Sequence, residues 1–515
     1  MNVILLHPAS WSGEFAKRRS SRTFFLPLGL LAVASPLEKA GIKAHIIDQC
    51  VDEDWEYLLN ERLKEKPVCV AMSVMTGSQI AYGLSVSRLI KETNPHVPVV
   101  WGGVHPTILP EQTVAHPDVD IVVEGEGEET FLELVTALNE KRGLGHVKGI
   151  CYKEGGSIKR NAPRPSVDLE RQPPLAYHLV DVKKYINRSL GRPALNTFTS
   201  RGCPHGCSCC YLGSFKGGKT YRCLSAKRVL ESVACLKERY GIKAIGFVDD
   251  NFFVDRARAF EILEGLKKMG MLWQNLNIRL DVLKEVSDEF FAIHKDMAPT
   301  TFTVSIESGS QRILDFLNKN ISISGLIEMN RKMSSYDITP FYNFMIGTPL
   351  ENEDDLRQTS NLILQLVRDN PHAEPRLYMF LPYPGTELYD ICLSRGLFKT
   401  PESLPEWSTL DSTTFDNRMW LTEKKKRMLE MLMFCAMMLS RKIVKRELSY
   451  LFTALVVAIM DKLVRAYRHI ARFRMKHIFY GFFIERKIAI LFGYSWKSKD
   501  MHRHRGRFNN KMRDF

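Results

Sequence analysis

Short apolar runs alternate with helical patterns over roughly the first 145 residues, and this alternation restricts the segment to an α/β fold. The runs are rich in valine and isoleucine and too short for helices, and they cover residues 3–6, 44–47, 68–72, 97–101 and 121–123. Strands that are apolar along their whole length predict a parallel sheet with helices on both faces. We therefore expect residues 1–145 to form a doubly wound, flavodoxin-like domain. Its ligand is expected at the carboxyl ends of the strands.

Glycines and polar residues directly follow three of the predicted strands. They are Ser73 after the third strand, Gly102, Gly103 and His105 after the fourth, and Gly125, Glu126 and Gly127 after the fifth. Glycines at strand ends let a ligand approach the backbone closely. Each loop alone is also consistent with a plain tight turn. Three such loops at the same edge of one sheet favour a bound cofactor.

The pattern changes twice in the rest of the chain. Prolines within residues 160–165 and 173–174 predict a linker over residues 146–195. Six further strand–helix units follow over residues 196–400, and they predict a partial (β/α)6 barrel of the TIM type with its chemistry at the top face. Residues 401–515 are expected to form an α-helical C-terminal region.

A run of four cysteines within eight residues follows the first strand of the predicted barrel. Cys203, Cys207 and Cys210 have C-x3-C-x2-C spacing, and three thiolates on one loop can bind three irons of a cubane and leave the fourth iron open. The other reading is a zinc site that adds His205 to these cysteines. Zinc sites usually combine two ligand pairs from separate turns, and the sequence has no second C-x2-C pair.

The cysteine loop and the motifs that follow it resemble the radical S-adenosylmethionine superfamily, and more narrowly its cobalamin-binding branch. The resemblance covers residues 1–400. The matching barrel motifs are, in order, Phe247-Val-Asp249-Asp250-Asn251, Ser305-Ile-Glu307-Ser-Gly309, Gly347-Thr-Pro349 and Pro384-Gly385-Thr386.

The resemblance implies three cofactors: a [4Fe-4S] cluster, S-adenosylmethionine and cobalamin. It makes the three spaced cysteines the iron ligands, and it matches the three glycine-containing loops of the first domain to cobalamin-binding loops. Ser305 and Glu307 are the expected contacts of S-adenosylmethionine, and Tyr211, Asp249 and Gly347 are further expected cofactor contacts. Asp249 has a second reading, as part of a capped strand–helix turn.

Two positions depart from the family pattern. Cys209 precedes the third ligand, where the family usually has an aromatic or aliphatic residue. The D-x-H-x-x-G cobalamin signature is absent, since the segment that begins at Asp48 lacks its histidine. The resemblance then implies cobalt without a protein histidine below it. A Rossmann-like domain that has lost its ligand is the other reading of the first domain.

The expected activity is reductive cleavage of S-adenosylmethionine to a 5′-deoxyadenosyl radical, followed by cobalamin-dependent methylation of an unactivated carbon. A flavodoxin- or ferredoxin-type protein is the expected electron donor. A radical cyclase or rearrangement enzyme with the same domains is the first alternative. A non-catalytic cobalamin- or metal-responsive binding protein is the second.

The C-terminal region has most of the positive charge. Residues 421–515 contain 23 Lys and Arg against 7 Asp and Glu, while the whole chain has a net charge of +14. Arg465, Arg468, Arg472 and Lys476 recur at helical spacing beside apolar residues, which suits anionic lipid and a lipid-like substrate. A helical cap over the barrel is an equal alternative, and a nucleic-acid partner is the least favoured. No apolar run is long enough to span a bilayer, so we expect a cytoplasmic protein with, at most, peripheral contact to the inner face of the membrane.

Overall fold

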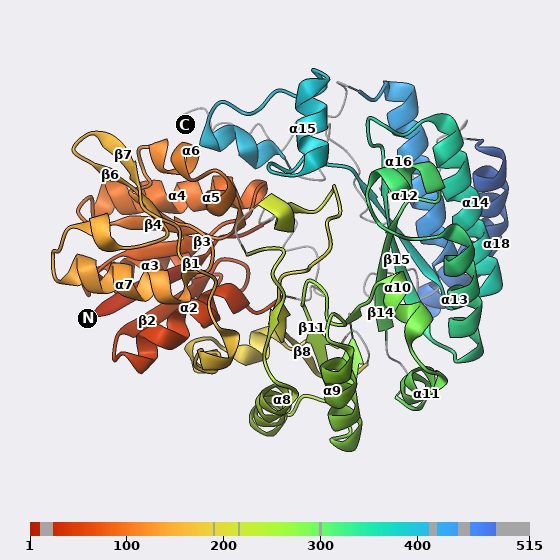
Figure 1. The fold of residues 1–515 in the computed structure, drawn as a ribbon, viewed down its shortest axis with the longest axis horizontal. Coiled ribbons are helices and arrows are strands. Elements are labelled where there is room, and N and C mark those ends of the chain that lie inside the picture. The colour runs from red at the N-terminus through yellow and green to blue at the C-terminus, as the bar shows by residue number, and fades with distance from the viewer. Residues whose placement is uncertain are drawn as a thin grey trace.

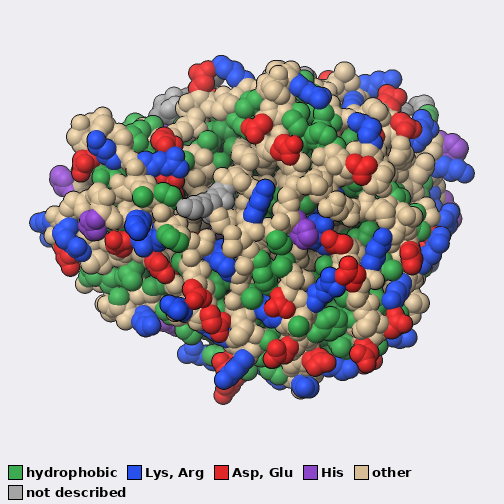
Figure 2. All heavy atoms as spheres, viewed as in Figure 1, with side chains coloured by type: hydrophobic (Ala, Val, Ile, Leu, Met, Phe, Trp, Pro, Cys, Tyr) green, Lys and Arg blue, Asp and Glu red, His purple; other side chains and the backbone are tan. Residues whose placement is uncertain are grey.

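The chain forms two parallel-sheet units followed by helices, as the alternation of strands and helices predicts (Figure 1). The computed structural model describes residues 1–10, 24–188, 191–214, 217–274, 276–297, 301–410, 420–440 and 454–479. Figure 2 shows acidic and basic side chains interspersed over one face of the molecule. The excess positive charge is therefore not gathered on that face.

The N-terminal sheet confirms the flavodoxin-like prediction, because its first five strands are parallel in the order β2-β1-β3-β4-β5. These strands are β1 (Asn2–His7), β2 (Lys43–Asp48), β3 (Val70–Ser73), β4 (Val99–Gly102) and β5 (Ile121–Val123). The helices are α2 (Leu28–Lys39), α3 (Trp55–Leu63), α4 (Ser78–Thr93), α5 (Val104–Ile108), α6 (Pro110–Ala115) and α7 (Gly127–Asn139).

Part of the predicted linker is wrong, because residues 150–160 belong to the sheet. β6 (Ile150–Glu154) pairs antiparallel with β5, and β7 (Ser157–Arg160) pairs antiparallel with β6. Gly155 and Gly156 both have positive φ, at 58° and 78°, and so allow the tight turn between these strands. We therefore propose that the first domain ends after β7 and that the linker begins with the prolines beyond it.

The second unit confirms the partial (β/α)6 barrel. Its strands are all parallel, and strands that follow one another in the chain lie side by side within two sheets. The first three strands form one sheet, and the last four form the other. They are β8 (Ala194–Thr197), β11 (Ala244–Phe247), β12 (Leu272–Gln274) continued by β13 (Leu276–Asn277), β14 (Thr301–Glu307), β15 (Thr339–Ile346) and β16 (Glu374–Met379). The outer helices are α8 (Ala226–Tyr240), α9 (Arg256–Lys268), α10 (Leu280–Glu285), α11 (Asp288–Asp296), α12 (Gln311–Phe316), α13 (Ile323–Ser335) and α14 (Glu353–Asp369).

Local sequence explains where these helices begin and end. The side chain of Ser225 accepts a hydrogen bond from the backbone of Arg228 and caps α8, which ends at Gly241 in the left-handed conformation. Asn352 and Asp355 form a reciprocal capping box at the start of α14. These cap residues thus determine where α8 and α14 begin and where α8 ends.

The C-terminal region packs against both units. α15 (Glu387–Ser394) is followed by a 3-10 helix (Leu404–Thr409), whose Leu404 and Trp407 join the core of the N-terminal sheet. α16 (Glu423–Leu439) packs on β16, and α18 (Ala454–His477) packs on α14 and α16. Residues 441–453 and 480–515 of the expected helical region lie outside the described residues.

The basic stripe predicted on the last helix is only partly turned outward. Arg465, Arg472 and Lys476 are exposed on α18, whereas Arg468 is half-buried and donates a hydrogen bond to the carbonyl of Met438. Among the described residues, none of the helices combines the length and the apolar character that crossing a bilayer requires.

Candidate functional site

The cysteine loop lies at the carboxyl end of the first barrel strand and is tightly fixed at its beginning. A short hairpin of β9 (Ser200–Arg201) and β10 (Arg222–Cys223) flanks it. Gly202 has a φ of 82°, and a Cβ atom there would lie 2.2 Å from the carbonyl oxygen of Thr220. Its backbone N–H donates to the carboxylate of Asp250 at 2.8 Å. Only glycine fits this position, so the start of the loop has a single backbone course.

The thiols of Cys203, Cys207 and Cys210 are partly exposed on this loop. The first two are close enough to Cys210 for their charges to add to burial in raising its pKa. In the described part of the chain, the one group of three metal-ligating residues with ligand atoms within 4.8 Å of one another is His7, Asp48 and Cys50. At least one distance between the three loop sulfurs therefore exceeds 4.8 Å, whereas two ligands of one zinc ion lie roughly 4 Å apart. That wider spacing fits a multi-iron cluster.

Each of the three loop thiols receives an N–H donor. The Nδ2 atom of Asn251 lies 3.8 Å from the first sulfur, and the Nη1 atom of Arg279 lies 3.9 Å from the second. The backbone N–H of Leu212 donates to the third. N–H donors to the sulfurs are a common feature of iron–sulfur sites, where they tune the bound cluster. We propose Cys203, Cys207 and Cys210 as the iron ligands on these grounds.

Cys209, which departs from the family pattern, has apolar surroundings. It packs against the apolar cluster that contains Phe380 and Leu388. Burial raises the pKa of its thiol to about 12. The structure therefore favours Cys209 as a packing residue.

Asp249 supports the loop and does not face an open site. Its carboxylate is buried and accepts hydrogen bonds from the backbone N–H of Thr199 at 2.6 Å, the Thr199 hydroxyl at 2.5 Å and the Ser200 hydroxyl at 2.6 Å. These bonds tie the end of β11 to the chain just before the cysteines. We therefore propose a positioning role for Asp249 in place of the expected cofactor contact.

Tyr211, a further expected cofactor contact, lies beside Asp250. Burial raises the pKa of Tyr211 to about 12.

Ser305 and Glu307 lie at the top end of β14, where the backbone is irregular. Ser305 is exposed, and the pairing with β15 shifts register between the two residues. Glu307 has a φ of 75°, a conformation that costs a non-glycine residue about 1–3 kcal/mol and that clusters at ligand sites. Its carboxylate pairs with the buried ammonium of Lys319 at 3.1 Å. Burial lowers the pKa of Lys319, but Glu307 and the nearby cysteines more than offset it, so the pKa is raised.

Both polar backbone groups of Gly347, the N–H and the carbonyl, are hydrogen-bonded to other parts of the protein. Its N–H donates to the carboxylate of Glu351 at 2.7 Å, and its carbonyl accepts from the indole of Trp420 at 2.9 Å. A Cβ atom there would lie 2.8 Å from Met379 Sδ and 3.0 Å from Leu429 Cδ1. Gly347 is thus required by packing under α16, and the expected cofactor contact is not supported.

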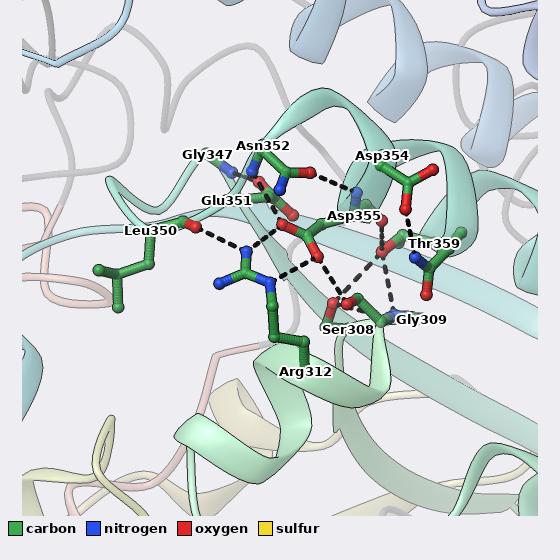
Figure 3. A network of polar contacts seen from close by, with 12 residues as sticks. Ser308, Gly309, Arg312, Gly347, Leu350, Glu351, Asn352, Asp354, Asp355 and Thr359 are labelled. Atoms are coloured by element: carbon green, nitrogen blue, oxygen red, sulfur yellow. Dashed lines mark hydrogen bonds and ion pairs between the residues drawn. The ribbon is translucent and has the colours of Figure 1, made fainter.

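A network of polar contacts joins this glycine to the motif at the end of β14 (Figure 3). The guanidinium of Arg312 pairs with the carboxylate of Asp355 and donates to the carbonyl of Leu350 at 2.9 Å. The backbone N–H of Gly309 donates to the Thr359 hydroxyl at 2.9 Å. The network holds the loops after β14 and β15 together, and so fixes the backbone from which Ser305 and Glu307 extend.

Within that network, Glu351 is expected to make stability depend on pH. Burial raises its pKa from 4.5 to about 7, so between these values the folded protein keeps a proton that the unfolded chain has lost. Stability therefore falls as pH rises through this window, by on the order of 3 kcal/mol in total. Glu351→Gln stays neutral and still accepts from Gly347. We expect the wild-type thermal midpoint to fall relative to that of the variant as pH rises from 4.5 to about 7, and to change no further above that. Parallel pH profiles of the two proteins would contradict this.

The loops after β3 and β4 pack against each other. Gly103 has a φ of 97°, and a Cβ atom there would lie 2.8 Å from the backbone nitrogen of Val74 and 3.0 Å from the Ser73 hydroxyl. Gly103 therefore lets the two loops meet and leaves no room for a ligand at its own Cα. Ser73 and Gly102 are partly exposed at the same edge of the sheet. They remain proposed cofactor contacts.

His105 does not face the predicted ligand site. Its ring is fully buried, with Nδ1 2.9 Å from the Thr76 hydroxyl and its edge on the Trp407 ring at 5.6 Å between centroids. Burial lowers its pKa to about 3, so the imidazole stays neutral. The 3-10 helix Leu404–Thr409, which follows the barrel in the chain, covers the His105 ring. This contact could not be predicted from the sequence, because the two segments are far apart in the chain. The expectation for His105 as a cofactor contact is therefore not supported.

The loop after β5 links the two units by ion pairs. Glu126 pairs with Arg201 at 3.1 Å and with Arg222 at 2.6 Å, and Glu128 pairs with Arg201 at 2.5 Å. Arg201 lies two residues before the first cysteine of the cluster loop. We call these four residues the inter-domain clamp. Glu126 thus connects the edge of the N-terminal sheet to the cysteine loop, and is not free to contact a ligand.

The two glycines beside Glu126 have different surroundings. Gly125 is exposed at a φ of 73°, and a Cβ atom there would meet no other atom within 4 Å. Gly127 begins α7, and a Cβ atom there would lie 3.1 Å from Val33 Cγ2. Gly125 remains a proposed cofactor contact, whereas Gly127 fits a packing role.

Sequence reasoning missed four residues of the site: Arg201, Asn251, Arg279 and Lys319. Asn251 belongs to one of the matched family motifs but had no predicted role, and Arg201 had none either. No local sequence pattern indicates a role for Arg279 or Lys319. These residues lie 72 and about 112 positions after the part of the cysteine loop that they approach.

Comparison with known proteins gives two domain matches. The B12 binding domain matches residues 18–135, and the Radical SAM superfamily matches residues 197–363. A protein named as an uncharacterized methyltransferase from Pyrococcus horikoshii is 32% identical over 78% of this chain and 85% of its own. The hopanoid C-3 methylase of Methylococcus capsulatus is 26% identical over 70% of this chain and 67% of its own. The anaerobic magnesium-protoporphyrin IX monomethyl ester cyclase of Cereibacter sphaeroides is 26% identical over 76% and 63%.

Solved structures agree with the fold. The cobalamin-dependent S-adenosylmethionine radical enzyme OxsB, with aqua-cobalamin and S-adenosylmethionine bound, superimposes with a TM-score of 0.71 at 17% identity, over 99% of this chain and 75% of that one. The radical S-adenosylmethionine methyltransferase TsrM from Kitasatospora setae, with cobalamin and a [4Fe-4S] cluster bound, gives a TM-score of 0.61 at 17% identity, over 78% and 76%. The order of the two sheets and the helices around them is thus a known architecture.

Proposed function

Because this chain belongs to the cobalamin-dependent radical S-adenosylmethionine methyltransferase family, we propose that it methylates an unactivated carbon of a hydrophobic or lipid-like small molecule. One observation carries the proposal above all. The loop with three partly exposed, spaced thiols is joined through Arg201 to the strand-end loop of the B12-binding domain. Methyl transfer from a corrinoid to a radical needs these two sites to be close and fixed.

The residues fit the cofactors of the family. Cys203, Cys207 and Cys210 would hold the [4Fe-4S] cluster, and Ser305 and Glu307 would hold S-adenosylmethionine at the top of β14. Ser73, Gly102 and Gly125, at the carboxyl ends of β3, β4 and β5, would contact cobalamin. When bound, these groups supply one-electron chemistry and a transferable methyl group. The chain itself orients them, and Lys319 pairs with the Glu307 carboxylate at the top of β14.

Two observations support a hydrophobic or lipid-like substrate. One relative is named a hopanoid C-3 methylase. On α18, Ile470 and Phe473 are 49% and 58% exposed, next to the exposed cations Arg472 and Lys476. Exposed apolar side chains beside cations suit the surface of an anionic membrane. We propose peripheral contact with such a surface, and a flavodoxin- or ferredoxin-type electron donor.

A second candidate is radical cyclisation with the same cofactors. Its support is the similarity to the magnesium-protoporphyrin cyclases. The two reactions differ in product mass, since methylation adds one methyl group and cyclisation removes hydrogen. The same assay therefore decides between them.

The test uses full-length protein purified and reconstituted without oxygen. It is incubated with a lipid extract, titanium(III) citrate and S-adenosylmethionine whose methyl group is deuterated. We expect a product heavier by one labelled methyl group, together with 5′-deoxyadenosine. Deuterium-free products that have lost hydrogen would point to cyclisation. A protein loaded with iron and corrinoid that leaves S-adenosylmethionine intact would contradict the enzymatic proposal.

A further inference from the structure

Arg279 has a charged N–H group directed at a thiol of the cluster loop. Its Nη1 atom lies 3.9 Å from the sulfur of Cys207. We propose that Arg279 sets the reduction potential of the iron–sulfur cluster, by favouring the reduced, more negative state. The inference rests on the proposed function only in requiring that the loop bind a cluster.

The guanidinium is held in one orientation by its other atoms. Nε and Nη2 donate to the carboxylate of Asp281 at 3.1 and 3.0 Å, and Nη2 also donates to the carbonyl of Lys319 at 3.1 Å. These bonds use Nε and Nη2, which form one edge of the guanidinium. Nη1 is therefore left to face the sulfur of Cys207, and the side chain is 16% exposed.

This orientation has an electrostatic consequence. Reduction adds one negative charge to the cluster and its thiolates, and a fixed cation stabilises the added charge, the more so away from bulk water. Hydrogen bonds to the sulfurs of a cluster raise its potential in the same way. Asp281 partly cancels the charge of Arg279, but it binds the Nε–Nη2 edge of the guanidinium, whereas Nη1 donates to the sulfur. The N–H group of Arg279 is therefore the part of this pair that contacts the thiol.

Two other donors near the cysteine loop, Lys319 and Asn251, are less suited than Arg279 to this role. Lys319 is also close to the loop, but Glu307 pairs with it at 3.1 Å. Asn251 donates to the thiol of Cys203 with a neutral amide, which has a weaker effect than a cation. Arg279 is thus the residue whose charged N–H bonds directly to a loop thiol. Its role is to position charge and not to react.

The experiment compares full-length Arg279→Gln and Arg279→Lys with the wild type. After anaerobic reconstitution, iron content is measured first, and the midpoint potential is then read by electron paramagnetic resonance during titration with titanium(III) citrate. We expect a shift to more negative potential in R279Q at unchanged iron content, and a smaller shift in R279K. Arg331→Gln removes an arginine that pairs with Asp369 on the surface, and serves as the matched control without a shift.

Asp281→Asn supplies a second measurement that keeps Arg279. Removing its negative charge is expected to move the midpoint potential in the positive direction, opposite to R279Q. An R279Q protein with full iron and an unchanged midpoint would overturn the proposal. If R279Q binds less iron, an unchanged midpoint in D281N overturns it instead. Absence of any cluster from the wild-type protein would be a failure of the proposed function, and is thereby distinguished.

Discussion

Replacing Cys203, Cys207 and Cys210 together by alanine is expected to abolish iron binding and, with it, cleavage of S-adenosylmethionine. The wild type should hold about four irons per chain, the number in a cubane. The three thiols are partly exposed and each receives an N–H donor, so their removal leaves the loop without ligands. Iron and sulfide analysis, with absorption spectra and release of 5′-deoxyadenosine, would measure the effect.

Cys209→Ser is the matched control for this experiment, because it removes a thiol from the same loop. The Cys209 side chain packs among apolar side chains, and burial raises the pKa of its thiol to about 12. The variant is expected to keep the iron content of the wild type and its cleavage activity. Loss of iron in C209S with retention in the triple variant would show that the ligand assignment is wrong. Zinc in place of iron in the wild type would exclude the cluster altogether.

Arg201→Met is expected to separate the two halves of the reaction. Without Arg201, the buried carboxylate of Glu128 has lost its partner in the inter-domain clamp, and only the Glu126–Arg222 pair of the clamp remains. Breaking a buried pair costs about 3–5 kcal/mol, and partial exposure of Arg201 places the expected loss at the lower of these values. Cleavage of S-adenosylmethionine should continue, while methylated product per 5′-deoxyadenosine falls by at least about tenfold, as small misplacements of reacting groups do.

Arg160→Met is the control for the clamp. Arg160 pairs with Glu124 at 2.7 Å and with Glu111 at 2.8 Å, at the same end of the N-terminal sheet but within that domain, and it is 49% exposed. An exposed pair contributes about 0–1 kcal/mol, so R160M should change neither stability nor product ratio measurably. Thermal unfolding and product quantification would compare the two variants. A wild-type product ratio in a folded R201M protein would contradict a role of the clamp in methyl transfer.

Sequence patterns predicted most of the architecture because they report local physics. Valine- and isoleucine-rich runs predicted the parallel strands of the first unit, and strand–helix alternation predicted those of the second. The spacing of Cys203, Cys207 and Cys210 predicted the candidate cluster loop. The β6–β7 hairpin was not predicted, because the prolines beyond it indicate a linker and the linker was extended over all of residues 146–195. Its signal was present in Gly155-Gly156, which sits between two short alternating runs.

The order of elements and the ligand-like spacing of the cysteine loop follow from the sequence, since periodicity, turns and short spacings act between near neighbours in the chain. The roles of the strand-end residues depend on tertiary contacts. Glu126 is paired with Arg201 75 positions away, and His105 lies under Trp407, about 300 positions away. Such contacts depend on how two sheets and a returning segment pack, and no local pattern encodes that packing. For the same physical reason, the donor that Arg279 directs at Cys207 became visible only in the fold.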